Sequence, residues 1–162
     1  MLDFETMYTH YADDVHSYAL GLSGSRETAQ DITSETFIRA WSRRESIRTE
    51  TLKAYLFRIA RNLFLEGYRK KRRETVLLDT IPDREPSPDK TAHIRMQLER
   101  AESLLLTLPE EERSVFLLRI RQGLSYAEIA RVTDLTLSAV KVTIHRIRKK
   151  LIKAILDMET AI

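Results

Sequence analysis

Apolar residues recur at steps of three and four positions through most of this chain, and this spacing limits its possible folds more than any other feature. The first half holds three such stripes: Phe4, Met7, Tyr8, Tyr11, Val15, Tyr18, Ala19 and Leu22; Ala29, Ile32, Thr33, Thr36, Phe37, Ala40 and Trp41; and Leu52, Tyr55, Leu56, Ile59, Ala60, Leu63 and Phe64. A period near 3.6 places each set on one face of a helix. We therefore predict three amphipathic helices, with Ser25 as the N-cap of the second and residues 42–51 as a loop.

Proline residues then divide the chain. Pro82, Pro86 and Pro88 lie among acidic residues in the segment 74–93, a composition that favours an extended linker. Beyond it a helical stripe resumes, with Ile94, Leu98, Ala101, Leu105 and Leu108 as its members. Another helix is expected after Pro109, where three glutamates meet the positive end of the helix dipole.

The last part of the chain carries the marks of two closely spaced helices. Ser125 and Glu128 form a capping-box pattern after Gly123, and a turn is expected at 133–135. The final helix, from about Thr136, has a buried stripe of Val140, Ile144, Ile147 and Leu151. No segment alternates with a period of two. The predicted fold is all-α, with two small helical domains joined by the linker and a helix-turn-helix in the second.

Composition excludes several classes of protein. The 162 residues include no Cys, which rules out disulfide scaffolds and thiolate metal sites and favours the cytoplasm. Only 4 Gly are present, and none forms a phosphate-binding loop. No apolar run reaches membrane-span length, and the histidines at 10, 16, 93 and 145 lack ligand spacing. We expect no catalytic residues, no metal and no cofactor.

Charge is distributed in alternating blocks. Residues 1–42 hold 2 basic and 7 acidic residues, 43–73 hold 11 and 3, 74–112 hold 4 and 10, and 113–162 hold 10 and 4. Two separate basic blocks suit a polyanion that is contacted at two places. Two solvated helix faces would give the same pattern, so charge alone leaves both interpretations open.

In the second half, the helix-turn-helix layout would place the last helix in a major groove. The buried stripe leaves a basic outer face on that helix, and Lys141 and Arg146 could meet base edges or phosphates there. Ser138 and Thr143 could hydrogen-bond to either.

In the first half, the third helix combines a complete apolar face with cations on its remaining surface. Arginines of the preceding loop, with Tyr55 and Phe57, add the mixture of cations and aromatic rings that holds unstacked bases. Tyr55 fits the buried stripe better than stacking, whereas Phe57 lies off the stripe. The second helix instead presents an outer face with Asp31 and Glu35, which DNA would repel and a protein could dock on.

Three segments together carry a family resemblance: TAQDITSETFIRAW (28–41), AYLFRIARNLFLEGYRKKRR (54–73) and LPEEERSVFLLRIRQGLSYAEIARVTDLTLSAVKVTIHRIRKKL (108–151). In this order, with an acidic proline-bearing linker between the second and the third, they resemble a bacterial sigma factor of the extracytoplasmic-function (ECF) group within the sigma-70 family. The resemblance covers nearly the whole chain. It implies that 1–73 correspond to region 2, 74–93 to the linker and 94–162 to region 4.

The resemblance also implies partners and roles. Region 2 would dock on the clamp helices of RNA polymerase core, and region 4 would meet its flap. Region 2 would also capture and melt the minus-ten promoter element, and region 4 would read the minus-thirty-five element. A probable anti-sigma factor would inhibit the protein by covering the docking helix and the recognition helix.

The residues that the resemblance assigns to each role are as follows. Polymerase docking falls to Asp31, Ser34, Glu35 and Arg39; minus-ten DNA to Arg43, Arg44, Arg48, Lys53, Phe57, Arg58, Arg61, Asn62 and Arg69; and minus-thirty-five DNA to Ser138, Lys141, Val142, Thr143, His145, Arg146 and Lys149.

Three positions depart from the family pattern. Ser34 stands where Gln is usual, Asp134 where a turn Gly is usual, and Thr143 where Arg is common. Aspartate tolerates left-handed backbone geometry better than most residues, so we expect the turn at Asp134 to form.

The main alternative function is a stand-alone helix-turn-helix repressor or activator. Such a protein would more often be a dimer, and it would not need an acidic docking helix beside a basic strand-capture helix. An enzyme is not expected, because no pair of carboxylates or nucleophile with a base is suggested.

Overall fold

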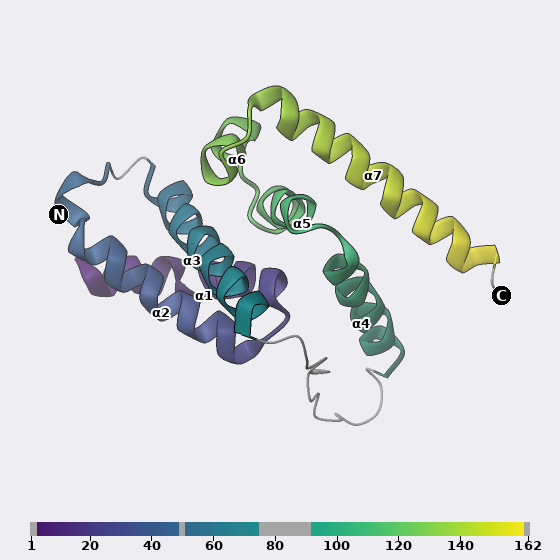
Figure 1. Ribbon diagram of the computed structural model, residues 1–162, viewed down its shortest axis with the longest axis horizontal. Helices are drawn as coiled ribbons and strands as arrows, with labels where there is room; N and C mark the ends of the chain where they lie inside the picture. The colour runs from purple at the N-terminus through teal and green to yellow at the C-terminus, as the bar shows by residue number, and fades with distance from the viewer. Residues whose placement is uncertain (1–2, 49–50, 75–91, 161–162) are drawn as a thin grey trace.

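The computed structural model describes residues 3–48, 51–74 and 92–160, and all regular structure in these ranges is helical. Three long helices come from the first half: α1 (Phe4–Ser23), α2 (Arg26–Ser42) and α3 (Leu52–Glu74), with the short helix η1 (Arg44–Ser46) between the last two. The second half forms α4 (Ala92–Thr107), α5 (Glu110–Phe116), η3 (Leu117–Arg121), α6 (Tyr126–Thr133) and α7 (Leu137–Thr160). Figure 1 shows the two sets as neighbouring groups, with α7 along the outer edge.

Side-chain caps begin the helices where the sequence predicts them. The Ser25 side chain accepts a hydrogen bond from the backbone N–H of Thr28, and α1 ends at Gly24 in the left-handed conformation, with φ of 68°. The capping box of Ser125 and Glu128 is complete. These local contacts satisfy backbone groups that helix ends leave unpaired, which fixes the boundaries of α1, α2 and α6.

The predicted linker lies largely outside the described residues, because 75–91 are not among them. No helix in the described part of the chain is long and apolar enough to cross a membrane.

Each half has its own buried apolar side chains. Tyr18, Leu22, Phe37 and Leu56 lie in the core of α1, α2 and α3, and each is at most 1% exposed. In the second half α5, α6 and α7 bury three apolar members of the predicted α7 stripe, while Leu151 at its end is half-buried. The prediction of two helical domains is confirmed.

The sequence did not indicate that the two domains pack against each other. Helix α3 contacts α6, and α1 contacts α4, α5 and η3, so that the buried apolar residues form one continuous cluster. A β-carbon added to Gly21 in α1 would lie 2.7 Å from both methyl carbons of Leu117. Only a glycine at this position lets Leu117 of the second domain approach α1 so closely.

The helix after α5 also departs slightly from the expected form. The backbone N–H of Gln122 donates to the carbonyl oxygen of Leu117 at 3.2 Å, a spacing of five residues, so η3 is a π-helical turn. Its side chains reach the first domain at Leu117 and its end reaches it at Gln122.

Candidate nucleic-acid interface

The outer face of α7 is free of packing within the described chain. Six of the seven residues predicted to read DNA are exposed on it: Ser138, Lys141, Val142, His145, Arg146 and Lys149. The side chain of Thr136 accepts a hydrogen bond from the N–H of Ala139, which caps the helix at its start. Val142 is 55% exposed among these polar residues, and an apolar side chain in this setting can contact a thymine methyl group.

The seventh residue, Thr143, is not on that face. Its side chain is 5% exposed, and its hydroxyl donates to the carbonyl oxygen of Ala139 at 2.7 Å. The predicted surface position of Thr143 is therefore wrong, because position 143 borders the buried stripe at 140, 144 and 147 and turns inward with it.

The turn before α7 forms with Asp134 in the left-handed conformation, at φ of 58° and ψ of 24°. The expected turn is confirmed with this unusual residue in it. Helices α6 and α7 are consequently held as a helix-turn-helix. Glu112, with its side chain 6% exposed, anchors the recognition helix to α5 through Lys150 at 2.7 Å and Arg146 at 3.8 Å.

A second basic surface lies on α3 and the loop before it. Arg43, Arg44 and Arg48 of the loop and Arg58 and Asn62 of the helix are exposed. The guanidinium carbon of Arg44 lies 4.2 Å from the centre of the Trp41 ring, a cation–π contact that holds this loop arginine in place. The side chain of Arg69 lies outside the described residues, although the backbone of α3 passes through it.

Phe57 does not belong to this surface. It is 1% exposed, and its ring packs edge-on against Tyr18 with the centroids 5.2 Å apart. The expectation that Phe57 is available for base stacking is wrong, because α3 packs against more than one neighbour and buries a wider face than its main stripe. Tyr55, which was expected in the core, is half-buried instead.

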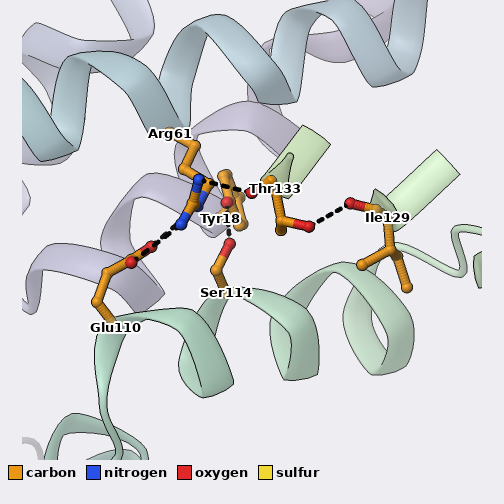
Figure 2. Close-up of polar contacts among 6 residues, drawn as sticks. All are labelled: Tyr18, Arg61, Glu110, Ser114, Ile129 and Thr133. Carbon is orange, nitrogen blue, oxygen red and sulfur yellow. Dashed lines mark hydrogen bonds and ion pairs between the residues drawn. The ribbon is translucent and has the colours of Figure 1, made fainter. Parts of the chain in front are cut away.

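Arg61 was predicted on the exposed face of α3 and is instead 8% exposed. Its Nε donates to Oε1 of Glu110 at 3.0 Å, and its Nη2 donates to Oε2 of the same carboxylate at 3.1 Å. Its Nη1 donates to the carbonyl oxygen of Thr133 at 3.3 Å. Figure 2 shows Arg61 between these two partners, both of which belong to the second domain.

Further polar contacts accompany this pair across the domain boundary. Arg58 forms an ion pair with Asp134, with Nη2 and Oδ1 3.2 Å apart, and Lys53 donates to the carbonyl oxygen of Gln122 at 3.1 Å. The hydroxyls of Tyr18 and Ser114 are hydrogen-bonded in the buried interface (Figure 2). Burial there raises the pKa of Tyr18 well above its ordinary value, so this phenol is neutral at any physiological pH.

An open cavity of about 400 Å³ lies where the basic surface meets the second domain. It is lined by Arg48, Thr51, Ala54, Tyr55, Arg58 and Arg131. Arg131 comes from α6, and the sequence analysis did not single it out because it is a lone arginine on a short helix. The cavity thus combines residues of both domains.

The outer face of α2 has the character expected of a protein-docking surface. Asp31, Ser34 and Arg39 are exposed and Glu35 is half-buried, with Nε of Arg39 3.0 Å from Oε1 of Glu35. Ile38 on the same face is 60% exposed, and the sequence analysis missed it. A large apolar side chain among charged ones is typical of a surface that binds another protein.

Comparisons with known proteins agree with this division. Residues 7–74 match the family described as Sigma-70 region 2, and residues 98–151 match the one described as Sigma-70, region 4. The chain is 34% identical to the ECF RNA polymerase sigma factor EcfG of Rhodopseudomonas palustris, over 85% of this chain and 76% of that protein. It is 32% identical to the ECF RNA polymerase sigma factor SigE of Mycolicibacterium smegmatis, but it covers only 61% of that relative's length.

Solved structures match across both domains together. The sigma factor RpoE, in complex with the anti-sigma factor NepR from Bartonella quintana, aligns with a TM-score of 0.78 and 24% identity, over 92% of this chain and 94% of that one. CnrH, in complex with the cytosolic domain of CnrY, aligns with a TM-score of 0.71 and 26% identity, over 96% and 88%.

Proposed function

This chain belongs to the ECF group of the sigma-70 family, and from that membership we propose that it binds RNA polymerase core and directs transcription from specific promoters. The observation that carries the proposal is the succession of regions 2 and 4 along one chain, each with an exposed surface of the appropriate charge. On this account 1–73 form the docking and strand-capture domain, 74–93 the linker and 94–162 the domain that reads the upstream element.

Polymerase docking is assigned to the outer face of α2. Asp31, Ser34, Glu35 and Arg39 are supported in this role by their accessibility, and Ile38 joins them as an apolar contact. Charged groups around an exposed apolar side chain favour a specific partner and steer its approach.

Minus-ten DNA is assigned to the strand-capture face, which comprises Arg43, Arg44, Arg48, Lys53, Arg58, Arg61, Asn62 and Arg69. Capture of a melted strand needs cations for its phosphates and a place for an unstacked base. The cavity beside Tyr55, between Arg48 and Arg58, supports the second requirement.

Minus-thirty-five DNA is assigned to Ser138, Lys141, Val142, His145, Arg146 and Lys149 on α7. Their joint exposure on a helix that follows a helix-turn-helix turn supports insertion into the major groove. Both promoter contacts would be made where polymerase and promoter DNA meet, in the cytoplasm.

We also propose that an anti-sigma factor inhibits this protein by covering the α2 face and α7. The support comes from CnrH, which was solved with the cytosolic domain of CnrY and aligns with this chain over both domains. Affinity purification of the tagged chain from cells grown under several conditions should recover such a partner, and its absence under all of them would contradict this part.

Transcription in vitro tests the proposal as a whole. Core polymerase supplemented with the chain should initiate on promoter-bearing fragments that core alone does not use, whereas an Asp31→Arg, Glu35→Arg variant should not support these starts. Tight binding to a specific DNA site without polymerase would instead favour a stand-alone repressor or activator.

A further inference from the structure

The strand-capture face is partly covered by the second domain of the same chain. Arg61 is 8% exposed beneath Glu110 and Thr133, Arg58 pairs with Asp134, and Lys53 is bound to the carbonyl oxygen of Gln122. These contacts involve three of the cations that the proposed function assigns to the minus-ten strand. Asn62, one turn from Arg58, stays exposed, so the covering is centred on the cations.

The groups that cover these cations have the chemistry of a nucleic-acid backbone. The Glu110 carboxylate binds the Arg61 guanidinium through two parallel hydrogen bonds, the geometry in which arginine also binds phosphate. An arginine side chain engaged in this way by a carboxylate has no second fork for a phosphate. The closed arrangement and strand capture by Arg61 therefore exclude each other.

Apolar packing shows that the closed arrangement is a fitted interface rather than a chance approach of charges. Leu117 is fully buried against Gly21, and the Gln122 side-chain amide donates to the carbonyl oxygen of Asp14 at 3.2 Å. Tyr18 and Ser114 hydrogen-bond in the same buried interface (Figure 2). Close packing and satisfied buried polar groups mark interfaces that persist in solution.

Asp134 adds a feature peculiar to this chain. A left-handed turn residue is best served by glycine, yet here the residue carries a carboxylate that reaches Arg58 of the first domain. The side chain thus gives the turn a role that glycine could not perform. We call the contacts of Arg58 and Arg61 with Asp134, Glu110 and the Thr133 carbonyl the clasp.

We infer that the chain inhibits itself: the clasp closes the second domain over the strand-capture face, so minus-ten capture requires the two domains to separate. The inference rests on the proposed function for its consequence, since an occupied Arg61 matters only if Arg61 binds DNA. Opening the clasp should raise the fraction of chains competent for strand capture, and apparent affinity should rise in proportion to that fraction.

The test measures the distance between the domains without polymerase or promoter. Because the chain has no Cys, Thr9→Cys on α1 and Lys153→Cys on α7 supply two exposed sites for spin labels or fluorophores. Labelled wild type should show one short distance population. Glu110→Lys should shift a large part of it to longer distances, and Glu111→Lys should not. The two substitutions place the same charge in the same first turn of α5, but Glu111 is exposed and lies outside the clasp.

A second measurement connects opening to strand binding. A pool of random single-stranded DNA should bind the Glu110→Lys variant about tenfold more tightly than the Glu111→Lys variant. Restoration of the short distance by Arg61→Glu combined with Glu110→Lys would show that the pair itself closes the chain. Long distances in wild type, or equal distances in the two lysine variants, would overturn self-inhibition, even if the chain still directs transcription with core polymerase.

Discussion

The guanidinium of Arg61 and the carboxylate of Glu110 are joined by two hydrogen bonds of 3.0 and 3.1 Å, although 49 residues separate them in the chain. Their side chains are 10% and 23% exposed, so the pair is largely shielded from water. Shielding strengthens such a pair and makes the loss of one partner costly, because the other charge stays behind in the interface. Arg61 therefore links the fold of the protein to its proposed activity.

Reversing the charge of the α2 face should prevent polymerase binding. In an Asp31→Arg, Glu35→Arg variant, two cations replace two carboxylates beside exposed Ile38, and we expect affinity for core polymerase to fall at least about a hundredfold. Pull-down with core polymerase measures this. The same charge change at exposed positions on α1, Glu5→Arg with Asp13→Arg, should leave binding nearly intact. Equal losses in both variants would remove the α2 face from the docking surface.

Removing the cation from the centre of the α7 face should weaken recognition of the upstream element. For Lys141→Ala we expect polymerase with bound chain to lose roughly tenfold in promoter affinity, within the range of about 1–3 kcal/mol for a base or phosphate contact. Filter binding or footprinting at fixed salt gives the value. Lys153→Ala, on the same helix beyond the predicted contacts, should change affinity much less.

Replacing the Thr143 hydroxyl should leave promoter choice unchanged. The hydroxyl donates to Ala139 within the helix and is buried, so Thr143→Val should alter the free energy of unfolding by about 1 kcal/mol or less. Start sites mapped with this variant should match those of wild type. A changed set of promoters would mean that Thr143 contacts DNA despite its position here.

Adding one methyl group at Gly21 should loosen the domain interface. Gly21→Ala brings its β-carbon to 2.7 Å from Leu117, and overpacking of this kind costs about 1–3 kcal/mol, more than the helix propensity gained. We expect a lower urea midpoint. Gly67→Ala is the matched control, since nothing lies within 4 Å of its added carbon and a gain of about 0.5–1 kcal/mol is expected. A stabilised Gly21→Ala variant would contradict the closed interface.

Local features of the fold were predictable from the sequence, and contacts between the domains were not. Ser25, Gly24 and the box of Ser125 with Glu128 mark helix ends through neighbours a few residues away, and the structure confirms the predicted helices around them. Spacing along α7 likewise identified most of its exposed face, because one stripe determines which side is buried.

The errors at Phe57 and Arg61 share a physical cause. Periodicity reports the main buried face of a helix, whereas α3 is covered by both its own domain and α6. A pairing between positions 61 and 110 leaves no periodic signal in either helix. Arg131 and Ile38 were missed for a related reason, since a single exposed residue acquires meaning only from what lies beside it. Thr143 lies at the border of the α7 stripe, where spacing alone does not separate inside from outside.

Transcription from a library of genomic fragments, with core polymerase alone and with core plus this chain, tests the central claim most directly. We predict new start sites that depend on the chain and share two sequence blocks upstream, one for each domain. If the chain adds no start site to those of core polymerase, or if the new sites share no common element, it does not act as a promoter-recognition subunit.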